Sequence, residues 1–143
     1  MAESLNKARQ RLVDEISAQQ RAGSGEIAVP LDLFFEGNDD RGSIGCNLGD
    51  EQPAIAEFYR TLVTLCRRPE VQDILVRICA VDDDESWPFA DTVYVISSLP
   101  QSSIESALAD LRFDEVLAKW MYGKPPAAAE PKPGFTPYSV WWD

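Results

Sequence analysis

Residues 71–81 read VQDILVRICAV, and residues 91–97 read DTVYVIS. Apolar and β-branched side chains dominate both stretches, and in the first they occupy both alternating faces, which is typical of a central strand. The nine residues between them begin with four acids and contain a proline, so they predict a loop. The two stretches together predict a β-hairpin whose first strand lies inside a sheet.

A second hairpin is expected earlier in the chain. Apolar side chains alternate along residues 28–35, and Pro30 suits a strand start or a sheet edge because it cannot donate a ladder hydrogen bond. Residues 36–42 are rich in turn formers and carry three acids, and residues 44–48 alternate again as a short strand. These segments predict a hairpin with a long acidic loop.

Helical periodicity marks the segments that flank these strands. Residues 4–21 place apolar side chains at spacings of three and four. A further helix is expected from about Glu51 to Arg67, with Asp50 as its N-cap and Pro69 preventing its continuation.

The pattern that follows the hairpin is again helical. Residues 102–105 read SSIE, which matches a capping box, so a helix should follow and bury Ile104, Leu108 and Leu111. A second helical piece is expected at about 113–121, with its apolar residues turned inward.

The C-terminal segment has a different composition. Residues 123–137 hold five of the ten prolines and predict an extended arm with polyproline character. A last short strand is expected at 138–142. The predicted fold is therefore a single α+β domain in the order α-β-β-α-β-β-α-β, with a mainly antiparallel sheet of four to five strands and helices on one face. Residues 1–123 should form this domain, and residues 124–143 should dock on it as a proline-rich arm and strand.

The net charge and the absence of histidine limit the functions that the protein can have. The formal net charge is −11, which argues against a nucleic-acid partner because phosphate contacts need a basic surface. The absence of histidine excludes a Ser-His-Asp triad, a Cys-His pair and a histidine-ligated zinc. No glycine-rich nucleotide motif occurs either. We therefore assign no catalytic, cofactor-binding or metal-binding residue, and the sequence favours a binding role over catalysis.

The expected compartment is the cytoplasm. The chain contains no apolar run of the roughly 18 residues that a membrane span needs, and its first 20 residues do not resemble a signal peptide. The three cysteines, Cys46, Cys66 and Cys79, are odd in number and widely spaced, so free thiols are expected. Without a histidine to activate it, Cys46 is interpreted as a buried structural residue.

The acidic run at residues 82–85 is the densest charge cluster. Its carboxylates could bind Mg²⁺ or Ca²⁺ through oxygen ligands, but the run lacks the glycine and the spacing of an EF-hand loop. A pair of carboxylates could also support acid-base chemistry, although 24 acids make a chance pair unavoidable. Solvated loop charge and a partner-binding surface are the other interpretations.

The leading hypothesis is an acidic protein-binding module of the cytoplasm, of the immunity or antitoxin type, that neutralises a basic protein partner. Tryptophans near the acidic segments could anchor that partner, or they could instead close the core. The candidate partner-binding residues are Asp39, Asp40, Asp82, Asp83, Asp84, Glu85, Trp87 and Trp142. The alternatives are a small carboxylate- or metal-dependent enzyme and a domain that forms a homodimer through the proline arm. No nucleic acid, membrane or cofactor is expected.

Overall fold

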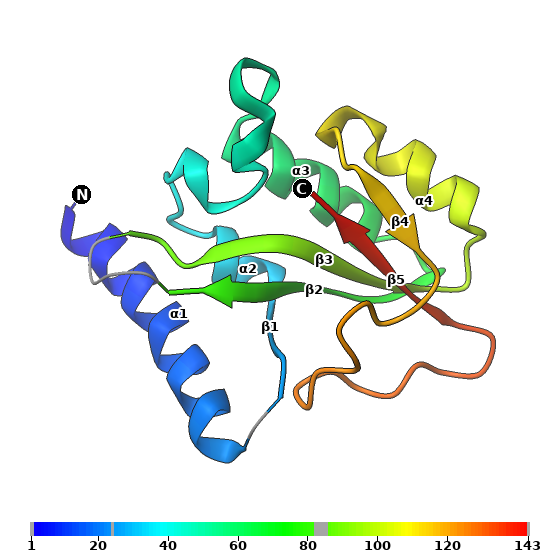
Figure 1. Cartoon of the computed structure of the whole chain (residues 1–143), viewed down its shortest axis with the longest axis horizontal. Helices are drawn as coiled ribbons and strands as arrows, with labels where there is room; N and C mark the ends of the chain where they lie inside the picture. The colour runs from blue at the N-terminus through cyan, green and yellow to red at the C-terminus, as the bar shows by residue number, and fades with distance from the viewer. Residues whose placement is uncertain (1, 24, 82–85, 143) are drawn as a thin grey trace.

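The computed structural model describes residues 2–23, 25–81 and 86–142, with side chains from Lys7 onward. Its elements are α1 (Ala2–Ala22), β1 (Ile27–Pro30), α2 (Leu31–Phe35), η1 (Arg41–Ser43), η2 (Cys46–Glu51), α3 (Ile55–Cys66), β2 (Val71–Ala80), β3 (Phe89–Ser97), α4 (Gln101–Leu108), η3 (Ala109–Leu111), β4 (Glu115–Leu117) and β5 (Thr136–Trp141), where η marks a 3-10 helix (Figure 1). No helix within these residues combines the length and the apolar character that crossing a bilayer requires.

The strands form one antiparallel sheet in the order β1-β2-β3-β5-β4. The β2–β3 hairpin is confirmed, and β2 lies between β1 and β3 as its two apolar faces predicted. The last strand is also confirmed: β5 pairs with β3 on one side and with the short strand β4 on the other. The protein is thus a single α+β domain.

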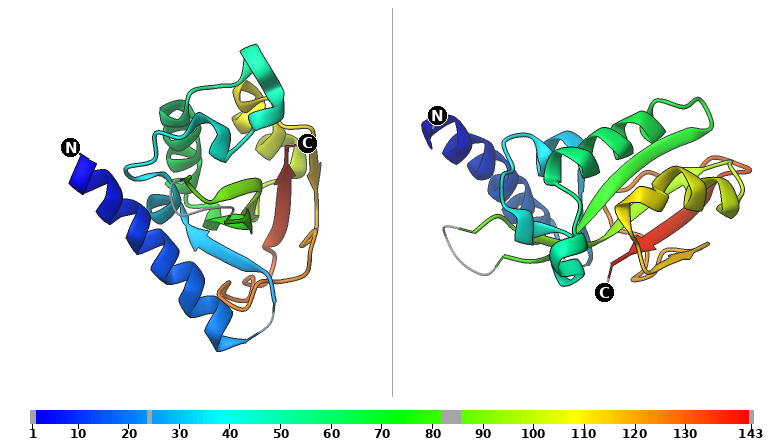
Figure 2. Two further views of the ribbon diagram at one scale, coloured as in Figure 1. Left: turned by 60° about the vertical axis from the view of Figure 1, so that its left-hand side comes forward. Right: turned by 90° about the horizontal axis from the view of Figure 1, so that it is seen from above.

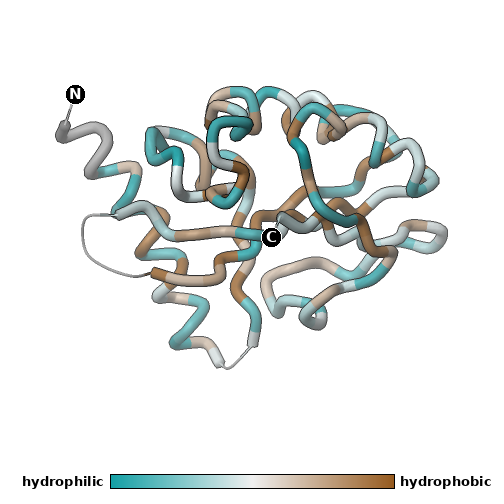
Figure 3. Tube along the Cα trace, turned by 45° about the horizontal axis from the view of Figure 1, so that its top comes forward, coloured by the Kyte–Doolittle hydropathy of each residue, from teal (hydrophilic) through white to brown (hydrophobic). Residues whose placement is uncertain are grey.

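Each face of the sheet is covered in a different way. All four α-helices contribute to the larger core on one face, where Leu12, Phe58 and Ile104 are fully buried. The segment between β4 and β5 covers the other face, where Ala128 packs in a smaller core with Tyr94. Figures 1 and 2 show α3 and α4 together on one side of the sheet, with the orange segment on the other. Hydrophobic residues concentrate along the strands between these layers (Figure 3).

The hairpin predicted for residues 28–48 is wrong. The chain leaves the sheet at Pro30, and α2 follows with Leu31, Phe34 and Phe35 buried. These three apolar residues have the i, i+3, i+4 spacing of a helix, which the alternation along 28–35 concealed. Of residues 44–48, only Ile44 makes a bridge to the sheet, to Ala90, before η2 begins.

Two predicted helix starts are also wrong. The N-cap of α3 is Ala54 and not Asp50, because a proline at position 53 restrains the preceding residue to an extended conformation. The capping box at 102–105 does not form, since α4 already begins at Gln101, after Pro100, and has no side-chain cap. The predicted burial of Ile104, Leu108 and Leu111 is nevertheless confirmed.

The helical piece expected at 113–121 does not form, and three of its residues make the short strand β4 instead. A left-handed residue, Arg112 (φ 56°), ends η3, and β4 then pairs with β5. Of the residues expected to turn inward, Val116 is buried but packs from an edge strand, whereas Leu117 and Trp120 are only partly buried. A short apolar run between turns is compatible with a helix or with a strand, and here pairing with β5 selects the strand.

Candidate functional site

Asp40 joins two segments that are 47 residues apart. Its carboxylate accepts a hydrogen bond from the backbone N–H of Gly42 at 3.0 Å, which caps η1, and another from the backbone N–H of Trp87 at 3.2 Å. The adjacent Asp39 is exposed. Two of the predicted partner-binding acids therefore lie where the loop after α2 meets the segment that leads into β3.

The remaining predicted acids, Asp82, Asp83, Asp84 and Glu85, lie outside the described residues. In the sequence they directly precede Ser86. The backbone carbonyl of Ser86 accepts a hydrogen bond from Arg9 Nε at 2.9 Å, so α1 also holds this segment.

The two predicted tryptophan anchors are buried, which corrects their interpretation as exposed partner contacts. Trp87 is 5% exposed, and its indole N–H donates to the carbonyl of Phe34 at 2.9 Å. Trp142 is 1% exposed, and its indole N–H donates to the carbonyl of Leu111 at 2.8 Å. The alternative interpretation holds for both rings: they close the core, and their donors are satisfied internally.

A pocket of about 400 Å³ opens at the end of the sheet where β2 stops and β3 begins. We call it the sheet-end pocket. Apolar surface comes from Phe89 and from Trp141, which is half-buried because it faces away from its buried neighbour in the strand. Oxygen acceptors come from Asn47 and Asp91.

The loop between η1 and η2 forms one wall of this pocket. Gly45 adopts a left-handed conformation (φ 67°), and a Cβ at this position would lie 3.1 Å from the Phe58 ring. Glycine alone meets both restrictions, so the chain can turn here from its bridge with Ala90 into η2. This turn brings Cys46 and Asn47 to the pocket wall.

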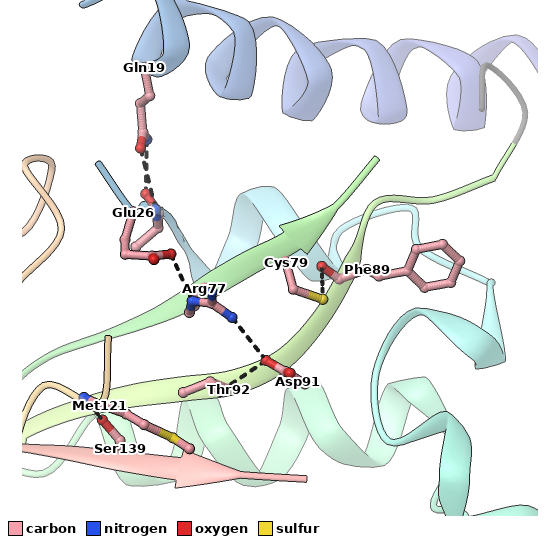
Figure 4. Close-up of polar contacts among 10 residues, drawn as sticks. Gln19, Glu26, Arg77, Cys79, Phe89, Asp91, Thr92, Met121 and Ser139 are labelled. Atoms are coloured by element: carbon pink, nitrogen blue, oxygen red, sulfur yellow. Dashed lines mark hydrogen bonds and ion pairs between the residues drawn. The ribbon is translucent and has the colours of Figure 1, made fainter. Parts of the chain in front are cut away.

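Arg77 organises the charge beside the pocket (Figure 4). Its side chain is 13% exposed, with Nε donating to Glu26 at 2.9 Å and Nη1 donating to Asp91 at 3.2 Å. The ring of Tyr122 covers the guanidinium at 3.5 Å. Burial by itself lowers the pKa of Arg77, but the hydrogen bond to Glu26 and the charges of Glu26 and Asp91 outweigh it and raise the pKa. The group of two carboxylates and one guanidinium remains negative by one charge.

The cysteines differ in part from their prediction. The three are free, as expected, but Cys46 is exposed, so its interpretation as a buried structural residue is wrong. Cys79 is also exposed and lines the same pocket, where its thiol donates to the carbonyl of Phe89 at 3.3 Å. Partial desolvation of the sulfur and the nearby Asp91 carboxylate raise the pKa of Cys79.

The sequence did not single out Trp141 and Asp91 as members of one site. The adjacent tryptophans at 141 and 142 indicated that one ring would face outward. Nothing in their spacing showed that this ring would lie beside an acid 50 residues earlier. Among the described residues, no group of three or more cysteine, aspartate or glutamate side chains is arranged to hold a metal ion.

The sequence pattern of one protein family, described as the "Uncharacterized protein YfbO family", matches residues 7–140, and the chain belongs to that family. "Uncharacterized protein YfbO" of Escherichia coli (strain K12) is 32% identical over 116 residues, which cover 80% of this chain and 81% of that protein. No solved structure matches the chain.

Proposed function

We propose that this member of the YfbO family is an acidic protein-binding module that binds and neutralises a basic protein, in the manner of an immunity or antitoxin protein. The observation that carries the proposal is the hydrogen bond from Trp87 N–H to the Asp40 carboxylate. It holds the acidic loop after α2 against the segment that the acidic run 82–85 precedes in the chain. The acidic loop after α2 is thereby tied to the segment that leads into β3.

The acidic loop after α2, which we call the acidic surface, carries charge that is available to a partner. Glu36 and Asp39 are exposed, and neither makes an ion pair with any residue that the structure describes. An acidic surface accelerates the association of a basic protein and disfavours acidic competitors. The proposal includes the cytoplasm as the site of action, and the three free thiols support this because reduced cysteines are typical of that compartment.

The proposal is tested by capturing proteins of the source organism on the immobilised full chain. The wild type is compared with Asp39→Lys and with Glu130→Lys, which introduces the same charge change at a side chain that is 85% exposed and pairs only with Lys124, at 3.9 Å, among the described residues. Glu130 lies beside Gln72, near the start of β2, whereas the sheet-end pocket lies where β2 stops. The control therefore changes the net charge without changing the acidic surface.

We expect the wild type and Glu130→Lys to retain a basic protein at about 0.05 M salt. Both should release it at about 0.5 M, since salt screens exposed charges. Asp39→Lys should fail to retain it. Equal retention by all three proteins, or the absence of any basic protein among those retained, would overturn the proposal.

A further inference from the structure

We propose that the sheet-end pocket receives an arginine side chain of the basic partner, an inference that rests on the proposed function and adds a specific contact to it. The Asp91 carboxylate would accept hydrogen bonds from the guanidinium, and the face of Trp141 would stack on it.

The first support is the unused acceptor capacity of Asp91. One oxygen of Asp91, Oδ1, accepts from both Arg77 and the Thr92 hydroxyl. The other oxygen makes no hydrogen bond within the described residues, and Asp91 lines the pocket with a side chain that is 36% exposed. No lysine or arginine is among the lining residues. Arg77 and Thr92 thus occupy one oxygen of Asp91 (Figure 4), and the other oxygen keeps its acceptor capacity beside a pocket whose lining has no lysine or arginine.

The second support is the aromatic surface. Trp141 and Phe89 line the same pocket as Asp91. A guanidinium is planar and weakly hydrated, so it can stack on an indole while donating hydrogen bonds in its own plane. Asn47 also lines the pocket, and its amide oxygen, to which the Cys46 thiol donates at 3.8 Å, has a second lone pair for a further hydrogen bond. An ammonium lacks this planar fork, which is why the arrangement favours arginine over lysine.

The third support is continuity with the acidic surface. Gly42 lines the pocket, and its N–H donates to the Asp40 carboxylate. A basic partner that binds beside Asp39 would therefore lie close to a wall of the pocket. A volume of about 400 Å³ lies in the range of pockets that hold small organic groups. Side chains that anchor interfaces commonly fill pockets of this kind.

The cysteines provide a direct measure of occupancy. Cys46 and Cys79 line the sheet-end pocket, whereas Cys66 lines a separate pocket beside Asp73 and serves as an internal control. The full chain is alkylated with iodoacetamide at low salt, with and without an acetylated hexa-arginine amide. The modification rate of each cysteine is measured by mass spectrometry. Hexaglutamine and hexalysine peptides are the comparison probes.

Hexa-arginine should slow the alkylation of Cys46 and Cys79 at least threefold and leave the alkylation of Cys66 unchanged. Hexaglutamine should protect neither Cys46 nor Cys79, and hexalysine should protect them less than hexa-arginine does. Asp91→Asn should weaken the binding of hexa-arginine about tenfold, since it removes a charge-assisted hydrogen bond. Trp141→Leu should weaken it about threefold. Glu130→Gln, which removes the same charge as Asp91→Asn, should bind as the wild type does.

Several outcomes would overturn the inference. They are the absence of hexa-arginine binding at low salt, binding without protection of Cys46 and Cys79, and unchanged binding by Asp91→Asn. Equal protection by hexalysine would overturn the assignment to arginine. If a thermal melt shows that Asp91→Asn does not fold, the inference is tested by the cysteine protection in the wild type and by the affinity of Trp141→Leu for hexa-arginine. Failure of the proposed function itself would appear separately, in the capture experiment with Asp39→Lys.

Discussion

The side-chain amide of Gln19 makes two hydrogen bonds to the backbone of Ala28. Its Nε2 donates to the carbonyl at 2.9 Å, and its Oε1 accepts from the N–H at 3.3 Å (Figure 4). Ala28 lies in the edge strand β1, so a helix side chain takes the place of a further strand. At the other edge of the sheet, Gln101 of α4 donates to the carbonyl of Val116 at 2.9 Å. Both edges are thus partly closed to pairing with another chain.

The first prediction concerns the edge at β1. Gln19→Ala should lower the free energy of unfolding by about 1–3 kcal/mol, because the backbone groups of Ala28, which is buried, lose their partner. It should also promote self-association through the exposed edge. Urea unfolding and light scattering measure the two effects. Gln20→Ala, on the exposed side of the same helix turn, should change neither; equal effects of the two variants would contradict the role of Gln19.

The second prediction concerns the Arg77 network. Arg77→Gln should destabilise the protein by about 1–3 kcal/mol, because it leaves Glu26 and Asp91 without their shared cation in a partly buried position. Arg60→Gln breaks an ion pair whose arginine is 74% exposed and should cost less than about 0.5 kcal/mol. Chemical denaturation of both variants tests this difference. A loss for Arg77→Gln no larger than that for Arg60→Gln would rule the network out as a stabilising feature.

The third prediction concerns two buried tyrosines. The Tyr94 hydroxyl is buried and makes no hydrogen bond to a described residue, whereas the Tyr138 hydroxyl donates to the carbonyl of Leu99 at 2.7 Å. Tyr94→Phe should therefore stabilise the protein at pH 7, by about 1 kcal/mol, since it removes an unsatisfied polar group. Tyr138→Phe should destabilise it by about the same amount. Effects of the same sign in urea unfolding would contradict this assignment.

Alkaline pH should also report on Tyr94. Burial raises its pKa from 10.0 to about 12, so the folded state favours the protonated phenol. The stability linked to this group is fully present below pH 10 and is lost as the pH rises toward 12. The fall in the free energy of unfolding over this range should be smaller in Tyr94→Phe than in the wild type. An identical fall in both proteins would show that Tyr94 does not control it.

The fourth prediction concerns Asp73. Burial raises its pKa, although the hydrogen bond from the backbone N–H of Ile74 acts in the opposite direction. Because the folded pKa is raised, the stability linked to this group is present at acid pH and is lost as the carboxyl ionises. Asp73→Asn should therefore be more stable than the wild type at pH 7, and the difference should shrink toward pH 3. A stabilisation independent of pH would exclude ionisation as its cause.

The parts of the fold that the sequence predicted are those with one uniform period. The β2–β3 hairpin, α1 and β5 each show a single apolar pattern over most of their length. The errors fall where two patterns overlap: Leu31, Phe34 and Phe35 satisfy a helix while residues 28–35 also alternate. Local pattern cannot choose between the two, because the choice depends on which neighbour buries the side chains.

The candidate site likewise combines features that the sequence showed with features that it did not show. The acidity of the segments around Asp39 and Asp40 was visible in the sequence, but their contact with Trp87 was not. The exposure of Cys46 follows from a glycine turn that holds it outside the core. The adjacency of Trp141 and Trp142 carried a weak signal, and only the meeting of Trp141 with Asp91 in one pocket distinguishes them from other tryptophans and acids.

The sequence by itself determined the fold class, the central hairpin, the excess of negative charge and the absence of imidazole chemistry, since these follow from composition and from periodicity within single segments. The tertiary structure alone decided which tryptophans are buried, which thiols are exposed and where the carboxylates gather. These properties depend on contacts between segments about 30 to 50 residues apart. The Trp142–Leu111 and Trp87–Asp40 hydrogen bonds are examples, and long-range packing makes such contacts without leaving a local pattern.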